Sequence, residues 1–408
     1  MNLLDMRPIV RTPQQQGVFD WTPDQLDCLD FLQDRLPNTC RTVLGSAGTG
    51  KTTIIAEYIK KATHKIIVTA PTHKAVKVLA DKVAAPTMTT HGFLGLKLKR
   101  ESGRQVFTFD EDYPFERCQE LIVDEASMIS NDLLGFLMQA QSFLNFTITF
   151  LGDEKQLPPV NEDIPPVFTR AYPQFELTTI VRQDNDIIDL SRNLDWIAQR
   201  KNGAHYSWLD PSELDVSKLV EANGTDFCKF LTWTNKAVKN INHSIRKLIY
   251  GADVGQFETG ETILITDHPF KITNGRIYRN NDEVAIERVM EGQVYNATAK
   301  HPYIKTQIIN DDLVVVHHES LGEHEENLKF LADLARSKQI RWGEFFAYKE
   351  SFAHYQYNHA ITVHKSQGST YDYAIINASE LLSCRDKNLR DKLLYTAVTR
   401  AKYHNYFI

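Results

Sequence analysis

A glycine-rich stretch near the N-terminus has the residue types and spacing of a phosphate-binding loop. Residues 45–52 read Gly-Ser-Ala-Gly-Thr-Gly-Lys-Thr and satisfy the pattern G-x-x-x-x-G-K-[ST]. Glycines let the backbone wrap so that successive N–H groups face an anion. Lys51 is expected to reach the outer phosphates, and the Thr52 hydroxyl to ligate Mg²⁺. The stretch predicts binding of a nucleoside triphosphate, but it does not say how the energy is used.

Polar residues with complementary chemistry follow two later apolar runs. Asp124 and Glu125 stand at the end of the run 120–124, and Gln156 follows 147–152. At these positions Asp124 would hold Mg²⁺, Glu125 would orient and deprotonate the attacking water, and Gln156 would sense the γ-phosphate. Taken alone, the acidic pair could equally cap a helix, and Gln156 could be a loop amide that bonds to backbone.

The elements that must position these residues alternate along the chain. Apolar strands are expected at 41–44, 65–70, 120–124 and 147–152, and helices at 53–59, 75–83 and 132–142. Thr22 is a suitable N-cap for an earlier helix, with Pro23 at its first position. Continuous apolar strands between helices predict a parallel sheet covered on both faces. The polar groups at the strand ends should then share one crevice.

A second α/β region is expected after residue 182, with a different pattern inserted in it. A strand at 230–234 and a helix at 236–250 precede the insert, and the region resumes at 360–364. Between 259 and 355 the runs are short and β-rich, with turns expected at Asn274-Gly275 and Glu291-Gly292. A strand is expected at 294–300 and a helical arm at 323–337. The insert reads as a small antiparallel barrel followed by that arm.

The composition describes an ordinary globular chain. Of 408 residues, 42% are hydrophobic and 24% charged, with no apolar run of membrane-spanning length and no secretion signal. Five scattered cysteines form no C-x-x-C pair, which favours a reducing cytoplasm over a zinc or disulfide framework. Residues 41–100 hold eleven basic and two acidic side chains, whereas 101–200 hold seven and eighteen. The basic block either follows a phosphate backbone or is a solvated surface without a partner.

The motifs taken together resemble the superfamily 1 helicases, specifically their RecD-like (1B) branch, which includes a small phage enzyme. The chain carries G-S-A-G-T-G-K-T at 45–52, A-P-T-H-K-A at 70–75, D-E-A-S-M at 124–128, G-D-E-K-Q-L-P-P-V at 152–160, V-H-K-S-Q-G at 363–368 and Y-T-A-V-T-R-A at 395–401. The resemblance covers about residues 18–408.

The resemblance implies an α/β fold of two RecA-like P-loop domains. A β-hairpin pin would be inserted in the first domain, and a small SH3-like β-barrel with a helical arm in the second. The implied boundaries are an N-terminal tail 1–17, domain 1A at 18–182 with the pin at 95–115, domain 2A at 183–258 and 356–408, and the insert 2B at 259–355.

The resemblance also implies that ATP and Mg²⁺ lie between the two RecA-like domains. Gln25 would read the adenine edge, and Arg182 and Arg400 would be arginine fingers delivered by the second domain. The expected catalytic residues are Lys51, Asp124, Glu125, Gln156, Arg182 and Arg400, and the expected metal ligands are Thr52 and Asp124. The nucleotide would lie against Gln25, Gly45, Ala47, Gly48, Thr49, Gly50, Lys51, Thr52, Thr53, Gly368 and Tyr395.

A DNA track is expected to cross both domains. Hydroxyls, amides and lysines would hold phosphates while aromatic rings stack bases. The candidates are Pro71, His73, Lys74, His91, Phe93, Thr234, Asn235, His364 and Lys365. The hairpin at 96–109, with Phe107 and Phe109, would split the duplex, and the alternative is a surface hairpin without that role.

The resemblance leads us to expect an ATP-dependent DNA helicase that moves 5′→3′ on single-stranded DNA. Forked duplex DNA would be its substrate, and single-strand-binding or replisome proteins its partners. The expected form is a monomer without a membrane partner, acting in the cytoplasm in phage replication or recombination. The chain shows no long N-terminal extension, which suits a phage accessory enzyme. The alternatives are a DNA-stimulated ATPase that remodels protein–DNA complexes without unwinding, and a P-loop switch without a DNA role.

Overall fold

Two units divide the chain in the computed structural model, which describes residues 21–101, 104–110, 112–160, 162–181, 185–209, 228–266, 270–271, 277–278 and 280–408. The first unit takes the described residues up to 209 together with 228–234 and 361–408, and the second takes those of 235–360. The expected tail 1–17, Arg182 and the turn Asn274-Gly275 lie outside the described residues.

The first unit contains a six-stranded parallel sheet in the order β3-β2-β6-β7-β1-β8. Its strands are β1 (Cys40–Gly45), β2 (Ile66–Ala70), β3 (Thr87–Thr89), β6 (Glu120–Val123), β7 (Thr147–Gly152) and β8 (Gln174–Leu177). The helices of this part are α1 (Pro23–Gln33), α2 (Lys51–Lys61), α3 (His73–Ala80), α4 (Thr90–Phe93) and α5 (Asn131–Leu144), with 3₁₀ turns η2 (Ala126–Met128) and η3 (Pro166–Thr169). The parallel arrangement expected from the apolar runs is therefore observed.

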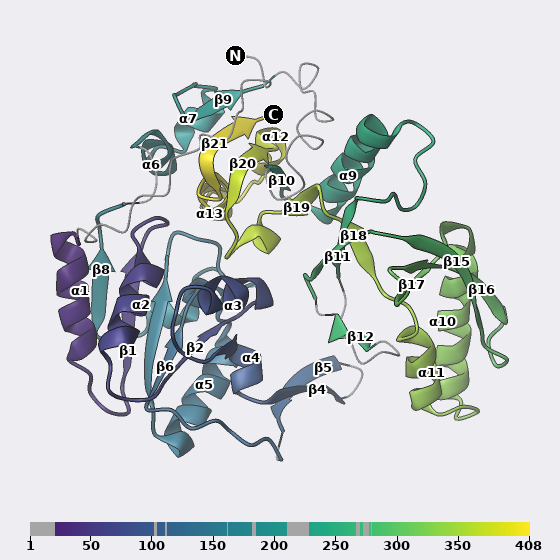
Figure 1. Cartoon of the computed structure of the whole chain (residues 1–408), viewed down its shortest axis with the longest axis horizontal. Helices are drawn as coiled ribbons and strands as arrows, with labels where there is room; N and C mark the ends of the chain where they lie inside the picture. The colour runs from purple at the N-terminus through teal and green to yellow at the C-terminus, as the bar shows by residue number, and fades with distance from the viewer. Residues whose placement is uncertain are drawn as a thin grey trace. The chain divides into compact units, whose positions relative to one another are not determined.

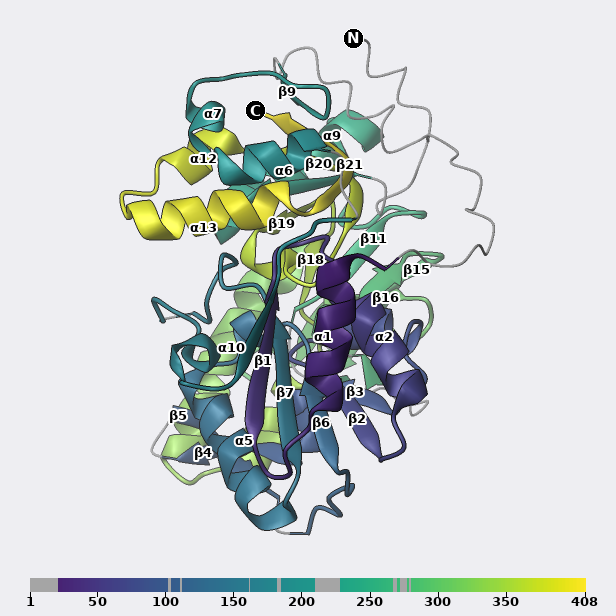
Figure 2. The ribbon, with the colours of Figure 1, turned by 90° about the vertical axis from the view of Figure 1, so that its left-hand side faces the viewer.

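Apolar side chains alternate between the two faces of this sheet. Val43, Val68 and Leu151 pack in one core with α1, α2 and α3, whereas Ile67 and Phe150 pack in the other with α5. Figure 2 shows α1 and α2 on one side of the strands and α5 on the other. Both faces are covered, and this is why the strands read as continuous apolar runs.

The strands of the sheet end at one level. Leu44 lies opposite Gly152, Val123 opposite Phe150, and Thr69 opposite Val123. The loops that follow β1, β2, β6 and β7 therefore leave the sheet along one edge. This register gathers the phosphate loop, the acidic pair and the Gln156 loop before any tertiary detail is considered.

A second sheet in the same unit has the order β19-β10-β20-β21-β9 (Figure 1). Its strands are β9 (Tyr206–Trp208), β10 (Cys228–Thr232), β19 (Ala360–Thr362), β20 (Tyr371–Ile376) and β21 (Ala401–Phe407). The helices are α6 (Asn185–Arg192), α7 (Asp195–Ala198), α12 (Ala378–Leu382) and α13 (Lys387–Val398), and the 3₁₀ turn η5 is His364–Ser366. The pairs β10–β20, β20–β21 and β21–β9 are parallel.

A two-stranded antiparallel hairpin extends from the first sheet's helical layer. Its strands are β4 (Leu96–Glu101) and β5 (Arg104–Phe109), with Leu98 opposite Phe107 and Leu96 opposite Phe109. Leu96 and Phe109 pack against the α5 core, so the base of the hairpin is anchored. The hairpin expected at 96–109 is present, and its role in splitting DNA is a separate matter.

Among its described residues, the second unit holds three small antiparallel sheets and three helices. Its strands are β11 (Thr262–Ile265), β12 (Phe270–Lys271), β13 (Ile277–Tyr278), β14 (Glu283–Ala285), β15 (Val289–Tyr295), β16 (Tyr303–Ile309), β17 (Leu313–Val316) and β18 (Tyr355–Tyr357). Its helices are α9 (Asn235–Tyr250), α10 (Leu321–Arg336) and α11 (Trp342–Lys349), and its 3₁₀ turn is η4 (His318–Ser320).

Two details of this unit differ from the expectations. The turn expected at Glu291-Gly292 is wrong, because both residues lie inside β15 and pair with Gln307 and Thr306. A Cβ on Gly292 would lie 2.9 Å from Thr306 Oγ1, so the glycine permits close cross-strand contact. The strand expected at 294–300 ends at Tyr295.

Helix α9 belongs to the second unit, although 183–258 was expected to form part of domain 2A. Its Asn242 amide donates to the carbonyls of Tyr357 (2.9 Å) and Ala360 (3.1 Å). Its buried Arg246 pairs with Glu261. These long-range bonds tie α9 to the inserted strands, and no local sequence pattern announces them.

Two whole-chain expectations can be compared with the structure. All five cysteines are free thiols, in agreement with the spacing argument. Within the described residues, no helix combines the length and the apolarity needed to cross a membrane.

Candidate active site

The glycine-rich loop lies between β1 and α2, as its pattern predicts. Gly50 is the N-cap of α2 and has a φ of 87°, a left-handed conformation that favours glycine. Lys51 Nζ donates to the carbonyls of Gly45 (2.5 Å) and Ser46 (3.3 Å), so the ammonium lies within the curve of the loop. The first-turn N–H groups of α2 and the Lys51 charge are therefore available to one anion.

The Gln25 side chain hydrogen-bonds to this loop. Its side chain is fully buried, with Oε1 accepting from Thr22 N–H (3.1 Å) and Nε2 donating to the Thr49 carbonyl (3.1 Å). A Cβ on Gly50 would lie 2.9 Å from that Nε2. Both ends of the amide are thus used within the chain, and holding the phosphate loop is the role that these contacts support. The expected reading of adenine stays a prediction.

The acidic pair follows β6 at the edge of the sheet. Asp124 Oδ1 accepts from the Glu125 N–H (2.8 Å), and Glu125 has a φ of 53°, which is strained for a residue with a side chain. Burial raises the pKa of both carboxyls, and the Asp124 charge raises that of Glu125 further. Lys51 opposes these shifts. Such an environment is typical of a general base or of a metal ligand.

A cavity of about 580 Å³ joins the two sheets of the first unit. Residues from both sheets line it, among them Lys51, Thr52, Asp124, Glu125, Gln156, Gly368 and Arg400. Gln156 is buried, and its Oε1 has no hydrogen-bond partner among the described residues. An unsatisfied buried amide oxygen in a polar cavity is suited to receive a water or a ligand hydroxyl.

Arg400 reaches the cavity from the end of α13 and is buried. Its guanidinium donates to the carbonyls of Thr396 (3.0 Å) and Ser369 (3.2 Å), and to the Thr399 hydroxyl (3.0 Å). These bonds fix the planar group, and its charge partly offsets the rise that burial causes in the pKa of Glu125. Gly368, with a φ of 72°, brings the second sheet's loop within 3.9 Å of the Glu125 side chain, measured from an ideal Cβ.

Contacts that the sequence analysis missed join the two sheets. The Tyr395 hydroxyl donates to Asp153 (2.6 Å), Gln367 Nε2 donates to the Leu157 carbonyl (2.9 Å), and Leu157 N–H donates to Thr396 Oγ1 (3.2 Å). All five residues stand inside the quoted motifs, so the signal was present without its pairing. Tyr395 lines a neighbouring cavity of about 520 Å³, with Ser46 and Lys155, and does not line the larger cavity.

The residues expected along a DNA track divide into exposed and buried groups. Phe93 is only 1% exposed and meets Phe146 edge to face at 5.7 Å, so its ring is a core ring and cannot stack a base here. Phe109 is partly buried against Phe136, with centroids 5.1 Å apart. The assignment of Phe93 is therefore corrected, because its ring lies in the α5 core, whereas the role expected of Phe109 stays a prediction.

Other track candidates remain accessible. Phe107 is 43% exposed, and its ring lies 4.9 Å from that of His91. Pro71 and His73 follow β2 at the common edge of the sheet. Lys74 lines the 580 Å³ cavity, and its ammonium lies 5.3 Å from the Tyr371 ring centre, which places it nearer the nucleotide-type site than expected.

The candidates from the second sheet occupy two adjoining loops. The Val363 N–H donates to the Thr232 carbonyl (2.9 Å), so the loop that carries His364 and Lys365 lies beside the loop that carries Thr234. Burial lowers the pKa of both His364 and Lys365. Asn235 is exposed at the start of α9.

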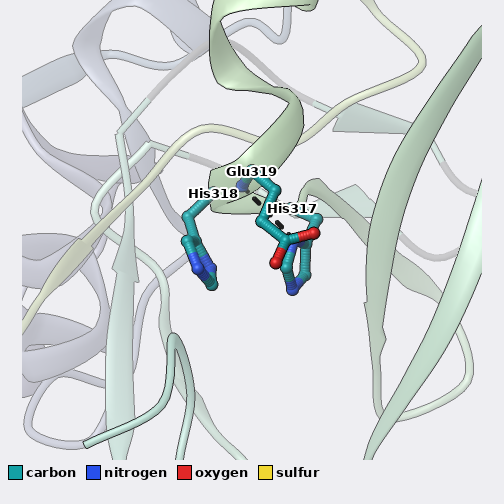
Figure 3. Close-up of side chains that lie close together, drawn as sticks. All are labelled: His317, His318 and Glu319. Atoms are coloured by element: carbon teal, nitrogen blue, oxygen red, sulfur yellow. Dashed lines mark hydrogen bonds and ion pairs between the residues drawn. The ribbon is translucent and has the colours of Figure 1, made fainter. Parts of the chain in front are cut away.

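A separate cluster in the second unit has metal-type ligands. His317, His318 and Glu319 bring one ligand atom each within 4.8 Å of one another, the one such group found among the described residues (Figure 3). Lys305 Nζ already pairs with Glu319 Oε2 at 2.8 Å. The carboxylate is therefore neutralised by a lysine, which disfavours a cation there.

Known proteins resemble this chain over most of its length. Residues 23–207 match the AAA domain family, and 357–408 match the UvrD-like helicase C-terminal domain. The ATP-dependent DNA helicase dda of Enterobacteria phage T4 is 28% identical, over 90% of this chain and 94% of that protein. The RecBCD enzyme subunit RecD of Buchnera aphidicola is 25% identical, over 97% and 77%. These similarities agree with an ATP-dependent DNA helicase of superfamily 1.

The fold of this chain is similar to that of a solved structure. The crystal structure of Pif1 helicase from Bacteroides in complex with ADP-AlF3 and ssDNA covers 96% of this chain and 92% of its own, with a TM-score of 0.53 at 19% identity. At that identity the likeness concerns the fold alone. It agrees with the two parallel sheets that flank the cavity.

Proposed function

We propose that this helicase hydrolyses ATP in the 580 Å³ cavity and uses the energy to move 5′→3′ along single-stranded DNA, unwinding forked duplex ahead of it. The observation that carries the proposal is the lining of that cavity. Lys51 and the acidic pair come from the first sheet, and Arg400 comes from the second. Two cations that can bind a triphosphate, and a carboxylate that can act as a base toward water, therefore line one cavity. Movement of the two sheets relative to each other would open and close it.

The cavity's donor set fits MgATP. The Thr52 hydroxyl and the Asp124 carboxylate would hold Mg²⁺, which would neutralise charge on the phosphates. Lys51 would exchange the carbonyls of Gly45 and Ser46 for phosphate oxygens. Glu125 would accept a proton from the attacking water, and the unsatisfied Gln156 Oε1 would orient that water. Burial raises the pKa of Glu125, and a raised pKa suits a group that accepts a proton from water.

Arg400 would supply the transition-state charge. A guanidinium is always protonated and grips phosphoryl oxygens through a planar fork, and such fingers contribute about 10³-fold or more. Arg182 would be a second finger and lies outside the described residues. Because Arg400 comes from the second sheet, hydrolysis would be linked to the approach of the two sheets.

DNA would cross the edge that carries the strand-end loops. His73, His91, His364 and Lys365 are the proposed contacts from the two sheets, and Phe107 at the hairpin is the proposed wedge. Opening one base-pair step costs about 1.4 kcal/mol of stacking, which a single ring can offset for one step at a time. The exposure of Phe107 supports this role.

The biological setting follows by analogy with the T4 protein. We infer a monomer that acts on forks in the cytoplasm of an infected cell, in replication or recombination. Single-strand-binding or replisome proteins would be its partners. This part of the proposal rests on the similarity to the dda helicase.

Strand separation on two matched forks tests the polarity. One duplex carries only a 5′ single-stranded tail and the other only a 3′ tail, with ATP and Mg²⁺ present. We expect unwinding of the 5′-tailed duplex and little of the other. Lys51→Ala should unwind neither, and preferential unwinding of the 3′-tailed duplex by the wild type would contradict the proposal.

A further inference from the structure

A single carboxylate organises the loop that carries Thr234. Glu380 lies in α12, 146 residues beyond that loop, and accepts from the Thr234 hydroxyl (2.6 Å) and the Trp233 N–H (2.9 Å). It also accepts from the hydroxyl of Thr232. Three donors from consecutive residues thus converge on one side chain.

The carboxylate is itself held in place. Asn377 is the N-cap of α12, and its Oδ1 accepts from the Glu380 N–H (3.3 Å). Its Nδ2 donates to the Thr232 hydroxyl (3.3 Å), so this hydroxyl has both a donor and an acceptor partner. Leu231 and Ile376 are paired in the sheet, and therefore the two loops leave adjacent strand ends. The hydrogen bonds lower the pKa of Glu380, although burial opposes them.

These bonds change what Thr234 can offer. A carboxylate accepts only, so the Thr234 proton points toward Glu380 and only lone pairs remain for a ligand. A DNA phosphate also only accepts, and it cannot take a hydrogen bond from this hydroxyl while the bond to Glu380 stands. The side chain expected to hold DNA directly is instead one that fixes the loop.

We propose that Glu380 is a positioning residue for DNA binding. Its carboxylate holds the loop 232–234 in the conformation that presents Trp233 and its neighbours to single-stranded DNA. The proposal rests on the DNA-translocating function proposed above. The adjoining loop with His364 and Lys365 bonds to the same Thr232, so the carboxylate lies at the junction of two proposed contact loops.

The sign of the effect separates this role from simple electrostatics. Removing a negative charge beside a phosphate-binding surface should tighten DNA binding. Loss of the positioning contacts should weaken it instead. The measurement is the single-stranded DNA concentration that half-saturates ATPase stimulation, with the saturated rate and the DNA-free rate recorded separately.

For Glu380→Ala we expect a rise of about tenfold in the half-saturating DNA concentration, with the saturated and DNA-free rates unchanged. Glu380→Gln should fall between, because its amide keeps one acceptor. Glu350→Gln, at the exposed C-cap of α11, is the matched control and should behave as wild type. Thermal melting of each variant identifies a folding defect, and the Gln variant keeps the test valid if the Ala variant unfolds.

Tighter DNA binding by Glu380→Gln, or an unchanged half-saturating concentration, would overturn the positioning role. A fall of the DNA-free rate in step with the melting temperature would also overturn it, as a purely structural role. A wild type that DNA does not stimulate would instead contradict the proposed function itself.

Discussion

Side chains from the two parallel sheets of the first unit line the proposed ATP-binding cavity. The spacing G-x-x-x-x-G-K-T predicted the Lys51 loop because its geometry is local, and the structure has it between β1 and α2. Burial is not local, so the same reading assigned the core ring of Phe93 to DNA and overlooked the bond between Asp153 and Tyr395. Glu380 carried no signal at all, since its partners lie 146 to 148 positions away.

The role of Arg400 gives the first prediction. Arg400→Lys should lower the ATP hydrolysis rate about 10³-fold while ATP binding changes little, because an ammonium cannot reproduce the planar fork. Phosphate release and nucleotide titration measure the two effects. Arg390→Lys, on a half-buried arginine of α13, should hydrolyse ATP as the wild type does. Equal losses of binding and hydrolysis in Arg400→Lys would contradict a transition-state role.

At the scale of elements, alternation and strand length were predictable because both faces of the first sheet are apolar. The affiliation of α9 was not, since Asn242 and Arg246 bond to strands that come much later in the chain. The different environments of the two hairpin phenylalanines were not predictable either. Phe107 is exposed, whereas Phe109 packs against the α5 core.

The hairpin gives the second prediction. Phe107→Ala should slow unwinding several-fold while DNA-stimulated ATPase survives, since the wedge is lost but the motor is intact. Phe109→Ala should instead destabilise the fold by about 2–3 kcal/mol, because its ring packs on Phe136. A strand-separation assay and denaturant unfolding measure the two effects. Loss of stability in Phe107→Ala with unwinding unchanged would contradict the assignment.

A buried ion pair between β1 and β6 of the first sheet gives the third prediction. Glu120 is fully buried and accepts from Arg41 (2.8 Å) and Tyr58 (2.7 Å). Burial raises its pKa, but Arg41 and the hydrogen bonds outweigh this and leave the pKa below the ordinary value. The stability it contributes is therefore present above the unfolded carboxyl pKa, about 4.3, and is lost as pH falls through the lower folded value.

Glu120→Gln should accordingly reduce the free energy of unfolding by about 3–5 kcal/mol at pH 7, because it leaves Arg41 buried without its counter-charge. The difference from wild type should begin to shrink as pH falls below the unfolded carboxyl pKa, about 4.3, and continue to shrink through the lower folded pKa. Denaturant unfolding across this range measures it. Glu116→Gln, which removes an exposed partner of Lys65, should cost at most about 1 kcal/mol, and a pH-independent difference for Glu120→Gln would contradict the argument.

At the scale of the whole molecule, the motifs predicted two parallel sheets around one nucleotide cavity, and the first unit contains that arrangement. Contacts between residues distant in sequence define the two units, and the expected domain boundaries stay a prediction. We propose that ATP hydrolysis in this cavity drives movement along DNA. The cavity residues from the second sheet must then respond to DNA that lies across the strand-end loops.

The ATPase rate with and without single-stranded DNA tests this claim most directly. The account predicts that saturating DNA raises the wild-type rate at least about tenfold, and that Lys51→Ala has no measurable rate in either condition. Lys60→Ala, an exposed lysine at the end of the same helix, should match the wild type. A wild-type rate that single-stranded DNA leaves unchanged would contradict the account.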